Sequence, residues 1–208
     1  LLAELLKALD QEENIAAAYA RQLPNAECSF VERYTRAFNY PDRSVVKTKD
    51  DLDKYGIKTF FCSNVCAAYK KDIYEKQGGF VRRTIFNEDM IYAGGLIQAG
   101  YGIAYAAEAR VIHSHNYNCM QQFHRNFDLG VSQAEHPEIF EGVPSEGEGM
   151  RLVKKTLAYL IHSGRVWLIP GFVLQCAGKY AGYLAGKKFR KLPKKFILWC
   201  TMSPNYWK

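Results

Sequence analysis

The adjacent carboxylates Glu88 and Asp89 form one candidate catalytic site in this sequence. They lie near the start of a helix that the sequence predicts over residues 86–99. A carboxylate on a rigid element beside a crevice could take a proton from a substrate hydroxyl. The same pair could instead complement the helix dipole in the first turn, with Asn87 as the N-cap. Spacing alone leaves both interpretations open.

His113 and His115 form a second candidate site, at the end of a strand predicted over residues 101–112. Residues two apart on a strand point to the same side, so both imidazoles could reach one metal ion or one phosphate. Two histidines are too few for a structural metal site, and the other ligands would have to come from elsewhere. Each could equally be a half-buried histidine with ordinary hydrogen-bond partners.

Three further polar side chains could contact a substrate. Ser63 and Asn64 interrupt the apolar run 60–69, which is predicted as a strand. Polar groups inside such a strand need partners, so they are either hydrogen bonders of the core or ligand contacts. Arg125 shares a helix face with Asp128, and its guanidinium suits a diphosphate. An ion pair with Asp128 is the simpler explanation.

Helices alternate with short apolar strands along the chain, which predicts an α/β fold with a mainly parallel sheet covered by helices. Residues 42–58 are charged and predict a loop or a short helix. Open α/β sheets bind their ligands at strand ends, where the candidate residues lie. The predicted helices cover 1–9, 27–39, 70–77, 86–99 and 118–131, and the predicted strands cover 15–20, 60–69 and 101–112.

Charge divides the sequence into two parts. Residues 1–149 contain 16 Lys and Arg against all 21 Asp and Glu, whereas residues 150–208 contain 12 Lys and Arg and no acidic residue. Only the second part is basic. The six cysteines are too sparse for a disulfide scaffold, and none forms a C-x-x-C pair that would indicate a zinc ribbon or a thioredoxin-type site.

Several short motifs follow one another in an order that resembles family-two glycosyltransferases. A further stretch, His115-Asn116-Tyr117 with Phe123-x-Arg125-x-Phe127-Asp128-x-Gly130, is similar to the bacterial rhamnosyltransferase branch. The resemblance covers about residues 14–132. Its other motifs are Ser63-Asn64-x-x-Ala67-x-Tyr69, Gly78-Gly79-Phe80, Glu88-Asp89-Met90, Gly100-Tyr101, Glu108-Ala109-x-Val111 and His113-Ser114-His115.

This resemblance implies a fold and a reaction. The fold would be part of the Rossmann-like GT-A fold, namely the acceptor-side half, followed by a helical basic C-terminal extension. The reaction would be inverting transfer of rhamnose from dTDP-L-rhamnose to a cell-surface polysaccharide or a lipid-linked acceptor. Asp89 matches the catalytic base of the family, and Glu88 would be its supporting neighbour.

From their residue types and places, we expect Ser63, Asn64 and Arg125 to contact the substrates. The resemblance implies a further binding role for the two histidines. His113 and His115 would help to hold Mg²⁺ or Mn²⁺ at the diphosphate of the nucleotide-sugar donor.

One family feature has no counterpart in this sequence. The family holds its metal with an Asp-x-Asp motif after a strand, but Asp51-Leu52-Asp53 comes too late in the family order and lies in a charged segment. The chain also begins inside a helical pattern of leucines. We therefore expect an inactive C-terminal part of a longer enzyme, with the main metal ligands in the missing N-terminal half. The alternative is a non-catalytic membrane- or polysaccharide-binding module that reuses the fold.

We expect three parts: residues 1–134 as the glycosyltransferase part, 135–149 as a linker, and 150–208 as a basic amphipathic extension. The uncharged run between Arg165 and Lys179 has 13 residues, and a spanning helix needs ~20. Aromatic residues interleaved with cations suit the headgroup layer of an anionic bilayer.

From this composition of the extension, we expect a cytoplasmic protein that binds peripherally to the inner face of the cell membrane. Nucleic acid is a less favoured partner, because no nucleic-acid motif is present. Packing of the extension on the rest of the protein or on a second copy is the simplest alternative.

Overall fold

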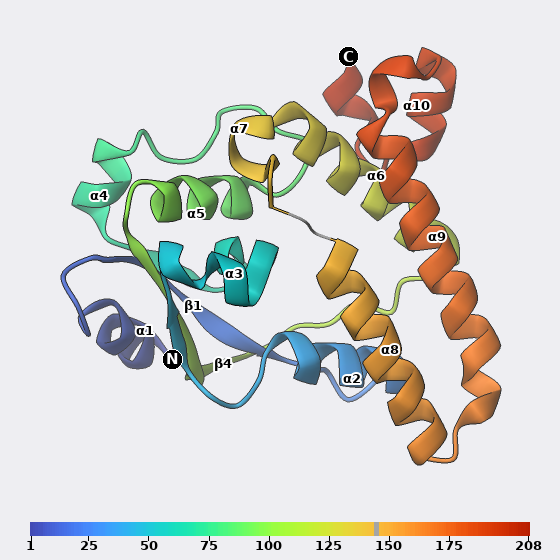
Figure 1. The fold of residues 1–208 in the computed structure, drawn as a ribbon, viewed down its shortest axis with the longest axis horizontal. Coiled ribbons are helices and arrows are strands. Elements are labelled where there is room, and N and C mark those ends of the chain that lie inside the picture. Colours follow the sequence, from blue (N-terminus) through green and yellow to red (C-terminus); the bar gives the residue numbers. More distant parts are fainter. Residues whose placement is uncertain (144–145) are drawn as a thin grey trace. The chain divides into compact units, whose positions relative to one another are not determined.

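The computed structural model describes residues 1–143 and 146–208, which form two compact units (Figure 1). Unit 1 comprises Leu1–Arg82, Glu88–Asn116 and Phe140–Leu152. Unit 2 comprises Arg83–Asn87, Tyr117–Ile139 and Val153–Lys208. Residues 117–134, expected with the glycosyltransferase part, thus group with the C-terminal helices, and the expected domain boundaries stay a prediction.

Unit 1 contains a mixed four-stranded sheet in the order β2-β4-β1-β3. β1 pairs with β4 in parallel, whereas β3 and β2 are antiparallel to their neighbours. The predicted α/β class is confirmed, but the prediction of a mainly parallel sheet is wrong. The two antiparallel strands have three residues each, too few to show a strand pattern in the sequence. The strands are β1 (Ile15–Leu23), β2 (Val45–Lys47), β3 (Ala67–Tyr69) and β4 (Gly102–Ile112).

The helices of unit 1 follow the predicted order. The run 60–69 differs, because a turn in which the Cys66 amide donates to the Ser63 carbonyl interrupts it and leaves only β3 as a strand. Segment 42–58 contains β2 as well as the short helices. The helical elements are α1 (Leu2–Leu9), α2 (Phe30–Asn39), η1 (Lys49–Asp51), α3 (Leu52–Tyr55), η2 (Gly56–Phe60), α4 (Lys71–Lys76) and α5 (Glu88–Gln98).

Alanines on β1 and β4 let α1 lie close to one face of the sheet. Leu5 and Leu9 of α1 pack with a buried cluster that includes Ala18 and Ala104, which are direct neighbours across the parallel pair. The next residues along both strands point to the opposite face. There the rings of Tyr19 and Tyr105 lie 5.1 Å apart, and Phe61 packs edge-on against Tyr19. The predicted strands therefore form the core of unit 1.

The remaining helices lie in the C-terminal half of the chain. α6 begins with an Asn118 cap, whose side chain accepts from the Gln121 amide. Two helical segments occupy parts of the predicted linker 135–149, of which residues 144–145 lie outside the described residues. The elements are α6 (Cys119–Glu135), α7 (Pro137–Phe140), α8 (Glu146–His162), η3 (Val166–Leu168), α9 (Ile169–Lys187), η4 (Phe189–Lys191), α10 (Lys194–Cys200) and η5 (Pro204–Trp207).

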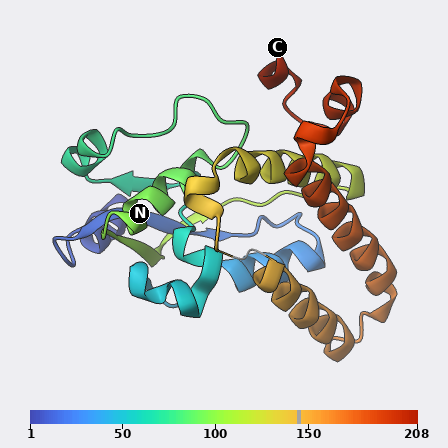
Figure 2. The same cartoon turned by 45° about the horizontal axis from the view of Figure 1, so that its top comes forward.

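α6 and α9 cross each other (Figure 2). Their chains point the same way, and their backbones touch at glycines of α9. A Cβ atom at Gly182 would lie 2.2 Å from the Phe123 carbonyl oxygen, and one at Gly186 would lie 2.1 Å from that of Phe127. Distances this short leave no space for any side chain. This glycine face, together with Gly178 one turn earlier, fixes how closely the two helices approach.

We predict that Gly186→Ala destabilises unit 2 by at least ~2 kcal/mol, because the new methyl group must push two backbones apart. Gly171→Ala is the matched control on the same helix, where nothing lies within 4 Å of the new Cβ. Alanine favours helix over glycine, so the control should be neutral or stabilising by up to ~1 kcal/mol. Urea unfolding followed by circular dichroism measures both, and equal effects would contradict the close contact.

Candidate functional site

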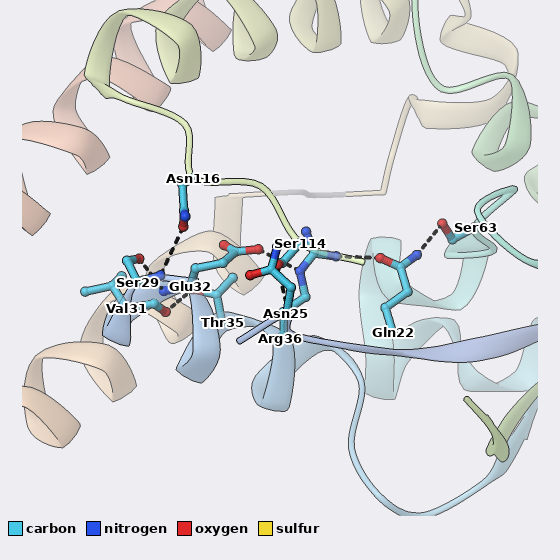
Figure 3. Close-up of polar contacts among 10 residues, drawn as sticks. All are labelled: Gln22, Asn25, Ser29, Val31, Glu32, Thr35, Arg36, Ser63, Ser114 and Asn116. Carbon is cyan, nitrogen blue, oxygen red and sulfur yellow. Dashed lines mark hydrogen bonds and ion pairs between the residues drawn. The ribbon is translucent and has the colours of Figure 1, made fainter. Parts of the chain in front are cut away.

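Polar side chains gather where the parallel strands β1 and β4 end (Figure 3). The backbone N–H of Asn25, after β1, donates to Ser114 Oγ, after β4, at 3.1 Å. Asn116 continues this link, since its Oδ1 accepts from the Ser29 amide at 3.0 Å and its Nδ2 donates to the Glu27 carbonyl at 2.9 Å. Side chains thus tie together two loops that are almost ninety residues apart in sequence.

A chain of side chains runs from α2 to Ser63 at this edge of the sheet (Figure 3). Arg36 donates from Nε to Glu32 Oε1 at 2.6 Å and from Nη1 to Gln22 Oε1. Gln22 is buried in β1 and donates from Nε2 to Ser63 Oγ at 2.8 Å. Burial raises the pKa of Tyr40, whose hydroxyl lies close to Ser63, to about 12. The hydrogen bond from Gln22 therefore orients the Ser63 hydroxyl.

Asn64 joins the two candidate carboxylates. Its backbone amide donates to Asp89 Oδ2 at 3.2 Å, and its Nδ2 donates to Glu88 Oε1, also at 3.2 Å. Its Oδ1 accepts a 2.6 Å hydrogen bond from the Tyr69 hydroxyl. The other Asp89 oxygen accepts from the Met90 amide at 2.7 Å. The structure thus brings together Asn64, Glu88 and Asp89, with Ser63 adjacent in the chain.

The environment of Asp89 favours a base stronger than an ordinary aspartate. Burial raises its pKa, and the neighbouring Glu88 carboxylate raises it further. Hydrogen bonds from the amides of Asn64 and Met90 oppose these effects only in part. Capping by Asn87 does not fit the geometry, because Asn87 has a φ of 62°, whereas N-cap residues adopt an extended backbone. The carboxylate is therefore held by the Asn64 loop.

An aromatic cluster supports Tyr69, the partner of Asn64. Its ring lies 5.4 Å from the ring of Phe80 and 5.6 Å from that of Tyr92. Gly79 has a φ of 69°, and a Cβ there would lie 2.7 Å from the Tyr74 ring. The Gly78-Gly79-Phe80 motif of the sequence is thereby explained. It lets the chain turn tightly against the cluster that positions Tyr69.

His113 and His115 lie together just beyond β4. Their ring centroids are 4.5 Å apart and the rings are perpendicular. Within residues 1–143 and 146–208, no group of three or more His, Cys, Asp or Glu residues could hold a metal ion. Mg²⁺ prefers an octahedron of oxygen ligands, which two imidazoles do not supply. The pair does not by itself fit the implied metal, and its metal role stays a prediction.

Arg125 belongs to unit 2, so the structure does not group it with the carboxylates of unit 1. Its guanidinium lies 4.5 Å from the ring centroid of Phe86 and 5.7 Å from that of Tyr117. Asp128 is buried and accepts a 2.6 Å hydrogen bond from the Thr201 hydroxyl. The direct contacts of Arg125 are thus cation–π contacts with these two rings.

Lys47 is a buried residue that the sequence analysis missed. Its ammonium donates to the carbonyls of Lys58, at 2.9 Å, and Phe61. It also lies 4.9 Å from the ring centroid of Tyr19, and burial lowers its pKa to about 7. These bonds hold the segment that leads into Ser63. A lysine in a charged segment gives no sign of this role, whereas Gln22 could have been found as a polar residue in an apolar strand.

Rhamnosyltransferase-like glycosyltransferases are the class of protein that this sequence resembles over nearly its whole length. One relative is the O-antigen chain rhamnosyltransferase WbaN of Salmonella anatum, with 42% identity over 207 residues, or 98% of the chain and 65% of the relative. Another is the O-antigen chain rhamnosyltransferase RfbN of Salmonella typhimurium, with 43% identity over 196 residues, or 93% and 62%.

These alignments confirm the predicted resemblance to rhamnosyltransferases. The chain spans somewhat less than two thirds of the length of these relatives. No family model matches the chain. No solved structure matches it either.

We predict that Arg36→Ala lowers the free energy of unfolding by ~1–3 kcal/mol, because buried Gln22 loses the donor to its Oε1. Arg33→Ala on the same helix is the matched control. Arg33 is exposed and makes one long bond, 3.4 Å, to the Ala26 carbonyl. The control should change stability by less than ~0.5 kcal/mol. Chemical unfolding of both variants tests the difference, and similar losses would argue against a structural role for the Arg36–Gln22 contact.

Proposed function

We propose that this chain takes part in transfer of a rhamnosyl group from a nucleotide-sugar donor to the hydroxyl of a saccharide acceptor in O-antigen synthesis. One observation carries the proposal: a half-buried carboxylate, Asp89, with a raised pKa and with hydrogen-bonded support from Asn64. The names of the relatives supply the substrate class.

In the proposed reaction, Asp89 accepts the proton of the acceptor hydroxyl while the hydroxyl oxygen attacks the anomeric carbon of the donor. A new carbon–oxygen bond forms, and the bond from the anomeric carbon to the phosphate oxygen of the donor breaks. The nucleoside diphosphate leaves with the electron pair of that bond. Attack opposite the leaving group inverts the configuration at the anomeric carbon. Each Asp89 oxygen accepts one backbone hydrogen bond and keeps further lone-pair capacity for the acceptor.

Neighbouring residues hold this base in place. The polar atoms of the Asn64 side chain both bond within the protein, to Glu88 and Tyr69, so we assign Asn64 as a positioning residue. The Glu88 carboxylate raises the pKa of Asp89. Ser63, oriented by Gln22, is the candidate hydroxyl for contact with a substrate.

The finer parts of the proposal concern the donor and the metal. We assign dTDP-L-rhamnose as donor and a saccharide or lipid-linked saccharide as acceptor, on a GT-A type fold. His113 and His115 lie at the strand ends, where they would contact the donor diphosphate. Mg²⁺ or Mn²⁺, when bound, would neutralise the charge of that diphosphate. The described residues do not complete such a site, so we assign its main ligands to the part of the relatives outside this chain.

We predict that Asp89→Asn in the full-length enzyme lowers turnover ~10²–10⁴-fold, because the amide cannot accept the proton. Donor affinity and melting temperature should change little. Asp72→Asn is the matched control, since Asp72 is an exposed carboxylate in the first turn of α4. Turnover should also fall as the pH drops through the raised pKa of Asp89. Wild-type turnover in Asp89→Asn would end the catalytic assignment.

For the histidine pair, we predict that the double change His113→Ala and His115→Ala weakens donor binding and raises the metal concentration needed for activity. The fold should survive, because both residues lie beyond the end of β4. Donor titration by calorimetry and thermal unfolding measure the two effects separately. A large loss of thermal stability with unchanged donor affinity would assign the pair a structural role instead.

A further inference from the structure

The side of α9 opposite the glycine face is apolar and exposed. Its residues recur at helical spacing, three or four apart, so they form one continuous row along the helix. We name this row the outer stripe. It consists of Pro170, Val173, Leu174, Ala177, Tyr180, Ala181 and Leu184, all of them exposed.

This exposure is unusual for a folded helix. Leu174 keeps 61% of its surface exposed, Tyr180 keeps 56% and Val173 keeps 50%. Scattered exposed apolar residues are ordinary, but a contiguous row on one face marks an interaction surface. Since the glycine face already packs on α6, α9 is apolar on both sides and only one side is covered.

Exposed cations lie at the C-terminal end of the outer stripe. Lys187 and Lys188 follow Leu184 by three and four residues, so they continue the same face of α9. Arg190 and Lys191 are exposed directly after them. No acidic residue occurs anywhere in residues 150–208. The charged residues of α9 and of the segment after it are therefore all cationic, which favours an anionic partner.

Two exposed tryptophans in the same unit favour a bilayer as that partner. Trp167 lies just before α9 and is 68% exposed, and Trp199 on α10 is 55% exposed and stacks on Phe196. Tryptophan and tyrosine rings suit the headgroup layer, where one part of the ring is apolar and the other is wet. Tyr183 and Tyr206 of the basic extension have no such role, because their hydroxyls donate to α6 residues.

The outer stripe occupies one side of α9 and the glycine face on the other side packs on α6, so α9 presents its long side to a partner. Within the described part of the chain, no helix is long and apolar enough to cross a bilayer. We propose that α9 lies flat on an anionic membrane, with the outer stripe in the headgroup and acyl boundary and with Lys187 and Lys188 against acidic lipid headgroups. The surface lies in unit 2 and does not depend on glycosyl transfer, so it stands or falls separately from the proposed function.

Sedimentation with lipid vesicles tests this surface on the unmodified chain. We expect binding to vesicles with about 30% phosphatidylglycerol in phosphatidylcholine, and none to pure phosphatidylcholine. Binding should weaken in ~0.5 M salt, where the Debye length falls well below 10 Å. Equal binding to both vesicle types, or binding to neither, would overturn the proposal.

A double variant locates the surface on α9. Val173→Glu with Tyr180→Glu places two carboxylates in the outer stripe and should weaken vesicle binding at least about tenfold. Leu2→Glu with Leu6→Glu is the matched control, because it makes the same charge change at two exposed apolar positions of α1. The control should bind the vesicles within about threefold of the unmodified chain, because a charge change of the same size outside the stripe acts only through screened electrostatics.

Two results would contradict the assignment of the stripe. One is equal loss of binding in the stripe and control variants, provided that circular dichroism shows both folded. The other is a dimer of the unmodified chain in sedimentation velocity that the stripe variant dissociates. That result would assign the outer stripe to a second copy of this chain.

Discussion

The parallel pairing of β1 with β4 is the constraint on which the candidate site depends. It brings the loops after Leu23 and Ile112 to one edge of the sheet, and side chains such as Ser114 and Asn116 then tie those loops together. Parallel strands cannot be joined by a tight turn, so the chain between them must cross over. That crossover contains Asn64 and Asp89. The pairing of β1 with β4 thus accounts both for the strand-end loops at one edge of the sheet and for a crossover that contains Asp89.

The carboxylate of the candidate site could be predicted from sequence because local features mark it. Glu88 and Asp89 open a helix, and the polar pair Ser63 and Asn64 interrupts an apolar run. The structure gives this pair the partners that buried or confined polar groups require. The sequence could not show that Asn64 bonds both carboxylates, since that contact joins residues 24 and 25 positions apart.

Other features depend on tertiary contacts that leave no local pattern. Lys47 looks like one more cation in a charged segment, yet the fold buries it against Tyr19 and two carbonyl groups. Strands β2 and β3 have three residues each, so their antiparallel pairing is set by their neighbours rather than by periodicity. Gln22 stands out as a polar residue in an apolar strand, but its contact with Arg36 depends on the packing of β1 with α2, which no local pattern shows.

The placement of tryptophan has a consequence for spectroscopy. The chain has three tryptophans, Trp167, Trp199 and Trp207, and all of them lie in unit 2. Intrinsic tryptophan emission therefore reports on unit 2 alone, while unit 1, which contains Asp89 on α5, contributes through its tyrosines. A change in tryptophan emission when ligand or lipid is added is therefore a signal from unit 2. Independent melting of the two units would be visible as a mismatch between emission and far-ultraviolet dichroism.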